Sequence, residues 1–240
     1  MNGPLAIALS LGFVLGLKHA LDPDHMVAVS TIVSEQKSVR RSSLIGTFWG
    51  IGHTASLLAV GIVVILSQRV IPPHIADRME LAVAFMLVFL GIRTLRRFFV
   101  GWRFHIHTHR HDGDPHSHFH VHRPQENLPA SQHHFPMRLG LRPFLVGMVH
   151  GLAGSGALML LVLGAMPSPF SRLAYIATFG VGSIGGMLAM SALISLPFVF
   201  TAIRFETMNR YIQAMAGALS IGLGILLMWQ HGMVAWLASI

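Results

Sequence analysis

The chain contains no cysteine and unusually few charged residues. Without thiols, disulfides and thiolate metal sites are both excluded, so imidazole, carboxylate or backbone oxygen must hold any metal. Only 11% of the residues are charged, whereas about a quarter are charged in an ordinary soluble domain. A soluble surface needs those charges for solvation, so the shortfall, together with a mean hydropathy of +0.62, indicates a membrane protein.

Long uncharged runs supply the membrane helices that this class requires. Four runs contain no Asp, Glu, Lys or Arg, namely 42–68, 143–171, 173–203 and 211–240. A helix of about 20 predominantly apolar residues crosses a bilayer, so each run is long enough. We predict an all-α integral membrane protein with six transmembrane helices, at 4–33, 43–67, 78–98, 141–165, 173–200 and 209–238.

The two halves of the chain resemble each other. Three short matches occur at offsets of 135, 131 and 133: 12–17 with 147–152, 47–48 with 178–179, and 90–92 with 223–225. The similar offsets favour duplication of a three-span unit. Because three is an odd number, the second copy enters the membrane from the opposite side and is inverted relative to the first. Such 3+3 inverted repeats are common in transporters, which bind substrate near the midplane between the halves.

The positions of Lys and Arg predict the orientation in the membrane. These residues cluster at the ends of apolar runs rather than over a basic face, which argues against nucleic acid as a partner. If the loop after the first span is cytoplasmic, 13 of the 17 Lys and Arg residues lie inside and 3 lie outside, while Lys18 falls within the span. The bias predicts a multi-pass plasma membrane protein, in the bacterial inner membrane, with both termini outside. The predicted divisions are membrane repeats at 1–98 and 140–240 and a cytoplasmic loop at 99–139.

The predicted loop is polar and rich in histidine. Eight of its histidines recur at short intervals: His105, His107, His109, His111, His116, His118, His120 and His122. We expect this loop to be disordered, because it has little apolar sequence and four prolines. Dense imidazoles suit the capture of Ni, Co, Zn or Cu, which makes the loop a candidate accessory metal-binding segment. The alternative is a merely hydrophilic linker.

The first predicted span carries five ionisable side chains, which are costly in a membrane and by default mark a functional site. They are Lys18, His19, Asp22, Asp24 and His25. On a straight helix His19, Asp22 and His25 fall within an arc of about 120°. Imidazole and carboxylate donors together suit late first-row divalent ions. The span is therefore a candidate metal site.

Pro23 lies within this run and should bend the helix. It removes the hydrogen bond to the carbonyl of His19, so we expect that carbonyl to be free as a further oxygen donor. The bend should also re-aim Asp24 towards the two histidines. Lys18 lies four residues before Asp22, and we expect an internal ion pair between them. On that interpretation Asp22 is structural, although it stays a candidate ligand.

Two further histidines are candidate ligands. His53 lies in the middle of the second predicted span, between glycines that permit close approach of another helix. The alternative is that it is a hydrogen-bonded core residue. His150 occupies the matching Gly-rich segment of the second half, where the ionisable cluster is replaced by Gly154-Ser155-Gly156.

These motifs resemble the nickel/cobalt transporter family. His19, followed after four residues by Asp24-His25, and then Gly52-His53-Thr54 in the next span, are most similar to its short, urease-accessory-type permeases. The resemblance implies a secondary permease for Ni²⁺ or Co²⁺ as transported substrate, with Zn²⁺ as a further candidate and no cofactor. It also implies cytoplasmic metallochaperones and urease or hydrogenase maturation proteins as partners. Some relatives import nickel, and others with His-rich loops export nickel and cobalt.

Two other classes compete with transport. An intramembrane serine protease could use Ser155 with His150, although flexible helix packing explains the Gly-Ser-Gly segment as well. A metal sensor or metallochaperone could bind metal through the loop, but it has little need of ligands at bilayer depth. A zinc metalloprotease would need a His-Glu-x-x-His motif, which is absent. We therefore expect a transporter and not an enzyme.

Overall fold

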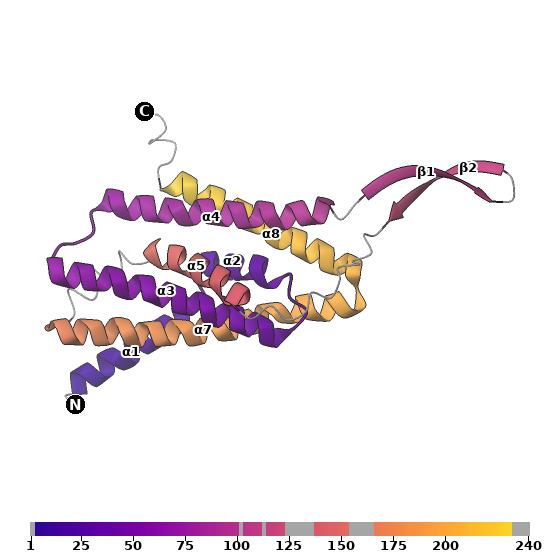
Figure 1. Ribbon diagram of the computed structural model, residues 1–240. Coiled ribbons are helices and arrows are strands. Elements are labelled where there is room, and N and C mark those ends of the chain that lie inside the picture. The colour runs from indigo at the N-terminus through magenta and orange to yellow at the C-terminus, as the bar shows by residue number, and fades with distance from the viewer. Residues whose placement is uncertain (1–2, 101–102, 112–113, 123–136, 154–165, 232–240) are drawn as a thin grey trace.

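The computed structural model describes residues 3–100, 103–111, 114–122, 137–153 and 166–231. Its elements, in chain order, are α1 (Gly3–His19), α2 (Pro23–Val33), α3 (Val39–Ser67), α4 (Pro73–Val100), β1 (Arg103–His111), β2 (Asp114–His122), α5 (Met137–Ala153), α7 (Pro169–Arg204) and α8 (Glu206–Gln230). The helices lie side by side in an elongated bundle (Figure 1). Helical segments thus occur in all six regions predicted to span the membrane.

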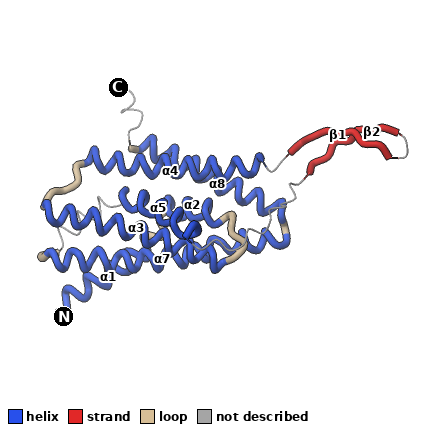
Figure 2. Tube along the Cα trace, in the orientation of Figure 1, coloured by secondary structure: helices blue, strands red, loops and turns tan. Residues whose placement is uncertain are grey.

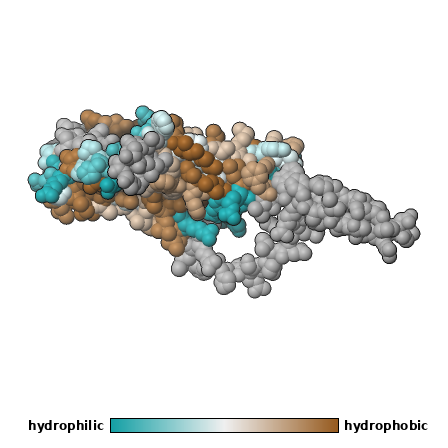
Figure 3. All heavy atoms as spheres, turned by 90° about the horizontal axis from the view of Figure 1, so that it is seen from above, coloured by the Kyte–Doolittle hydropathy of each residue, from teal (hydrophilic) through white to brown (hydrophobic). Residues whose placement is uncertain are grey.

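The bundle has the length and apolarity of a membrane domain. Within the described residues, α3, α7 and α8 are each long and apolar enough to cross a bilayer, and α1 with α2 adds a fourth candidate span if the bent pair counts as one. Apolar side chains also cover much of the outer surface (Figure 3). Exposed Leu66, Phe89 and Trp229 would be unfavourable in water and are favourable against lipid.

The first predicted span is broken at Pro23, as expected. The two halves, α1 and α2, meet at 54°. Proline occupies the first position of α2, where its missing N–H costs no helical hydrogen bond. The carbonyl of His19 is not freed, contrary to expectation, because the N–H of Asp22 donates to it at 3.1 Å. A tight turn therefore replaces the expected bend within a continuous helix.

Loops and chain ends divide between the two ends of the bundle (Figure 1). One end of the bundle holds residues 34–38, the end of α4, the strands, the start of α5 and residues 204–206, and we call it the hairpin end. The opposite end, named the termini end, holds Gly3, 68–72, the start of α7 and the end of α8. Both described chain ends therefore lie opposite the His-rich segment.

The His-rich segment contains an antiparallel hairpin (Figure 2). The expectation of disorder is therefore wrong for 103–111 and 114–122, while 123–136 lies outside the described residues. Histidine recurs there at every second position, which is the period of a strand, and the sequence between the strands is Asp-Gly, typical of short hairpin connections. The backbone register pairs histidine with histidine: His105 with His120, His107 with His118, and His109 with His116.

Glycines allow the helices to approach until backbones touch. α3 packs against α5 and α7, α1 against α7, and α4 against α8. On α5, a Cβ at Gly147 would overlap the carbonyl of Trp49, and on α1 a Cβ at Gly16 would overlap that of Phe179. Without a hydrophobic force between helices in lipid, such close packing is a main source of association.

The crossing of α5 with α3 should accordingly be intolerant of any side chain at Gly147. We expect Gly147→Ala to lower the melting temperature of detergent-purified protein by several degrees, because overpacking costs about 1–3 kcal/mol. Gly222→Ala is the matched control, since nothing lies within 4 Å of a Cβ there. Equal melting temperatures for the two variants would contradict this account of the crossing.

Candidate metal centre

Three elements meet at the break between α1 and α2. The break carries His19, Asp22, Asp24 and His25, while α3 contributes His53 from halfway along its length. α5 contributes His150 from its last turn. The close crossing of α5 on α3, set by Gly147 and the neighbouring Gly151, brings His150 to the level of His53. The result is a contiguous cluster of imidazoles and carboxylates inside the bundle.

The first part of the cluster joins three histidines. His19 Nε2 lies 3.2 Å from His53 Nε2. A potential ligand atom of His25 lies within 4.8 Å of both. Asp22 contacts the other ring nitrogen of His19, Nδ1, at 2.7 Å. That contact orients the imidazole and leaves Nε2 directed at His53.

The second part of the cluster is centred on Asp24. One carboxylate oxygen lies 3.1 Å from His25 Nδ1, and the other accepts from His150 Nε2 at 2.8 Å. The three potential ligand atoms again lie within 4.8 Å of one another, so His25 belongs to both parts. Asp24 thereby links the broken first span to the second half of the chain.

Burial makes this cluster energetically costly without a further partner. His25, His53 and His150 are almost fully buried. One ring nitrogen of each has no hydrogen-bond partner among the described residues: His25 Nε2, His53 Nδ1 and His150 Nδ1. An unpaired buried polar atom costs about 1–3 kcal/mol, so a group that bonded to these nitrogens would stabilise the cluster.

Two aromatic rings form the walls of the cluster. The buried indole of Trp49 stacks on His25, with ring centroids 5.8 Å apart and planes 13° from parallel. Phe179 of α7 lies 5.4 Å from the ring of His19. Apolar walls exclude water and strengthen electrostatic interactions inside the site. Sequence reasoning missed both residues, although Trp49 lies one helical turn from His53 and could have been found by that spacing.

One expected interaction is wrong. Lys18 makes no ion pair with Asp22 within the described part of the chain; its side chain is exposed, and Asp22 contacts His19 instead. The spacing of four residues assumed a continuous helix, but α1 ends at His19 and the turn carries Asp22 away from Lys18.

The remaining candidates lie elsewhere. The histidines of the hairpin follow α4 at the hairpin end, away from the cluster along the chain (Figure 1). Gly154-Ser155-Gly156, on which the serine protease alternative depends, lies outside the described residues. His150 itself contacts Asp24, which gives it a partner other than a serine nucleophile.

A bundle of apolar helices around buried His side chains and the partly buried Asp24 defines a membrane protein with an ionisable cluster in its interior. The chain is 38% identical over 239 residues to the urease accessory protein UreH of Bacillus sp. (strain TB-90), which covers 93% of this chain and 91% of that protein. It belongs to the UreH family, as its motifs indicated, and is therefore not an enzyme.

A more distant relative is the chloroplast protein FOR GROWTH AND FERTILITY 1 of Arabidopsis thaliana. It is 25% identical over 216 residues, which are 89% of this chain and 56% of that protein. No family model and no solved structure matches the chain.

Because Lys18 is exposed and does not pair with Asp22, its removal should be harmless. We expect Lys18→Met to leave the yield unchanged and the melting temperature within about 2 °C, as for other surface substitutions. His150→Ala should instead lower the melting temperature by several degrees, because it removes a buried ring and one partner of Asp24. Loss of folded Lys18→Met protein would restore the ion pair as the better explanation.

Proposed function

We propose that the chain is a membrane permease for divalent transition metal ions, Ni²⁺ or Co²⁺ in particular, and that it binds the ion at the cluster of His19, Asp24, His25 and His53. The observation that carries this proposal is the convergence of buried imidazoles with the Asp24 carboxylate, in two groups whose potential ligand atoms lie within 4.8 Å of one another. Such donors suit late first-row ions. The urease accessory role named for the relative is consistent with nickel as substrate.

The spacing of the donors supports a shared ion. Two nitrogens that bind one ion at about 2.1 Å each are separated by about 3.0–3.4 Å, and the Nε2 atoms of His19 and His53 are 3.2 Å apart. A metal-binding histidine usually donates its other N–H to a carboxylate, which fixes the ring. Asp22 holds this position towards His19, so its role is to orient a ligand rather than to bind the ion.

We further propose a six-span architecture built from two inverted repeats, and the helix contacts support it. A Cβ added at Gly91 of α4 would lie 2.5 Å from the carbonyl oxygen of Gly217 on α8, and a Cβ added at Gly224 of α8 would lie 2.8 Å from that of Ala84 on α4. Adding 133 to Ala84 and Gly91 gives Gly217 and Gly224. Replacing each residue of one contact by its counterpart in the other half therefore gives the other contact. An internal two-fold axis between the halves would produce this relation.

The same relation holds between the other crossings. The contact of Gly16 with Phe179 corresponds to the contact of Gly147 with Trp49. Gly16 of α1 and Gly147 of α5 are 131 residues apart, and Trp49 of α3 and Phe179 of α7 are 130 apart. The contacts thus align Gly16 with Gly147, rather than Gly12 as the sequence match suggested. The ring of His19 lies 5.4 Å from Phe179, and that of His150 lies 5.6 Å from Trp49. His150 is then the counterpart of His19 in the second half, which favours it as a ligand.

We propose that the hairpin end is cytoplasmic and that both termini lie outside a plasma membrane. The excess of Lys and Arg at the hairpin end supports this orientation. A cytoplasmic hairpin would buffer or concentrate the metal and hand it to metallochaperones or maturation proteins. Efflux by the same fold is the second candidate, and the His-rich segment favours it. Metal flux into and out of proteoliposomes, with Ni²⁺, Co²⁺ and Zn²⁺, distinguishes the two directions.

Asp24→Asn tests the assignment of the ligands. Asparagine is near-isosteric, so we expect the melting temperature to stay within a few degrees. An amide binds a dication poorly, so the initial rate of Ni²⁺ flux should fall at least tenfold. Asp77→Asn is the matched control, because that carboxylate is exposed at the termini end and lies 3.4 Å from His231, away from the cluster. Wild-type flux in the Asp24→Asn variant would contradict the metal site.

The His-rich hairpin should be an accessory to transport rather than part of the path, since it lies beyond the end of the bundle. Replacing its eight histidines with serine should change the half-saturating metal concentration a few-fold. The maximal flux should stay within about twofold of the wild type. Abolished flux in a correctly inserted variant would instead put these histidines in the translocation path.

A further inference from the structure

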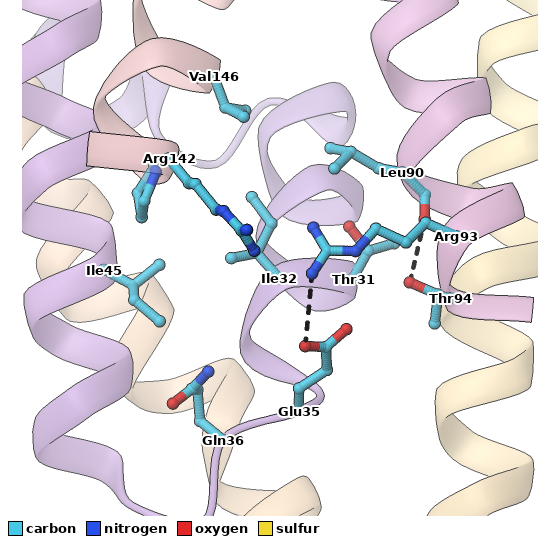
Figure 4. Close-up of a pocket in the computed structure, with 11 residues that line it drawn as sticks. Thr31, Ile32, Glu35, Gln36, Ile45, Leu90, Arg93, Thr94, Arg142 and Val146 are labelled. Atoms are coloured by element: carbon cyan, nitrogen blue, oxygen red, sulfur yellow. Dashed lines mark hydrogen bonds and ion pairs between the residues drawn. The ribbon is translucent and has the colours of Figure 1, made fainter. Parts of the chain in front are cut away.

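A cavity of about 160 Å³ lies at the hairpin end, between α2, α3, α4 and α5 (Figure 4). A single water needs roughly 10–15 Å³ of such space, so the cavity has room for several waters or a hydrated ion. Its polar lining includes Thr31, Glu35, Gln36, Arg93 and Arg142. The guanidinium of Arg142 extends into it from α5, and that of Arg93 from α4 (Figure 4).

The cavity lies directly beyond the metal cluster along three helices. On α3 its lining residue Ile45 is two turns from His53, and on α5 Val146 is one turn from His150. On α2, Thr31 follows His25 by about 9 Å. Between the two lies a layer of fully buried side chains that includes Ala28 and Trp49. Cavity and cluster are therefore consecutive along the bundle, separated by one to two helical turns.

Glu35 is the acidic side chain of this cavity. It follows α2 and forms ion pairs across to α4 with Arg97 and, at 3.9 Å, with Arg93. It stands about 16 Å beyond Asp24 along the direction of α2. The carboxylate is partly buried, with a side-chain exposure of 26%. Its two arginine partners are more exposed than it is and can move away.

Building on the proposed function, we propose that this cavity is a second, transient metal compartment and that Glu35 binds the ion within it. In the absence of metal, Arg93 and Arg97 neutralise the carboxylate; an arriving dication replaces them. The neighbouring positive charges of Arg93 and Arg142 keep the affinity low. Transport requires such a site, because a path conducts only where binding is favourable enough to enter and weak enough to leave.

A purely structural role for Glu35, as a tie between α2 and α4, makes a different prediction. If the ion pairs serve only to hold α2 against α4, removing the Glu35 carboxylate and removing its two arginine partners should lower flux and melting temperature equally. If Glu35 binds the metal, removing the carboxylate is harmful, whereas removing the arginines leaves it free for the ion. The two sides of the ion pair therefore serve as each other's control.

The experiment measures Ni²⁺ flux by full-length variants in proteoliposomes. Glu35→Gln should lower the maximal rate about tenfold and leave the half-saturating Ni²⁺ concentration within twofold, since the cluster around Asp24 is intact. Arg97→Gln, alone and with Arg93→Gln, should keep at least half of the wild-type rate. Glu35→Asp should recover part of the lost rate. Glu206→Gln is the matched control, because this carboxylate lies at the same end and pairs with Arg210 at 3.2 Å.

Equal losses of rate and melting temperature in Glu35→Gln and in the double arginine variant would overturn the proposal in favour of the structural tie. Unchanged flux in Glu35→Gln would overturn it as well. Both results are distinguishable from failure of the proposed function, in which Asp24→Asn would transport Ni²⁺ like the wild type. Loss of flux in Asp24→Asn with unchanged flux in Glu35→Gln would support the cluster as the metal site and contradict only the proposal of a second compartment.

Discussion

At Pro23 the backbone cannot continue the hydrogen bonds of α1, and the chain must turn before a new helix begins. The rest of the site depends on this interruption. It ends α1 at His19, starts α2 one residue before Asp24, and sets the two half-helices at 54°. On a continuous helix Asp24 would point away from the histidines. Across the break, the carboxylate reaches both His25 and His150.

Backbone contact between helices is the second requirement. Gly147 and Gly151 let α5 lie directly on α3, and this crossing brings His150 within the same cluster as His53. The corresponding glycines of α1 and α7 hold the broken span against the other side of the bundle. A side chain at these positions would separate the helices and pull the donors apart. Small residues therefore determine the geometry of the site although none of them carries its chemistry.

The cluster is one of three features that follow one another along the bundle. The cluster near His53, the buried layer at Trp49 and the cavity at Glu35 follow one another towards the hairpin end. Several imidazoles lie in the cluster, whereas the cavity contains one carboxylate among arginines. The halves also differ in chemistry: under the offset of 130, the partner of His53 is Ser183, a buried hydroxyl with no hydrogen-bond partner in the described chain. The two halves are therefore related in backbone arrangement but not in the donors that they contribute.

The class of protein, the helical regions, the family and the residue types of the candidate site follow from the order of residues alone, because apolar runs and the ionisable side chains within them are local features. The sequence also identified Pro23 as the place where the first span breaks. Which donors meet depends on how the helices pack. His150 became a partner of Asp24, and Asp22 turned from Lys18 to His19, because both contacts depend on helix crossings and a turn that no local pattern records. The hairpin was missed for a related reason. The polar composition of this segment favours disorder, whereas its alternating histidines favour a strand. Pairing with a second strand, which is not a local property, makes the strand the more stable of the two.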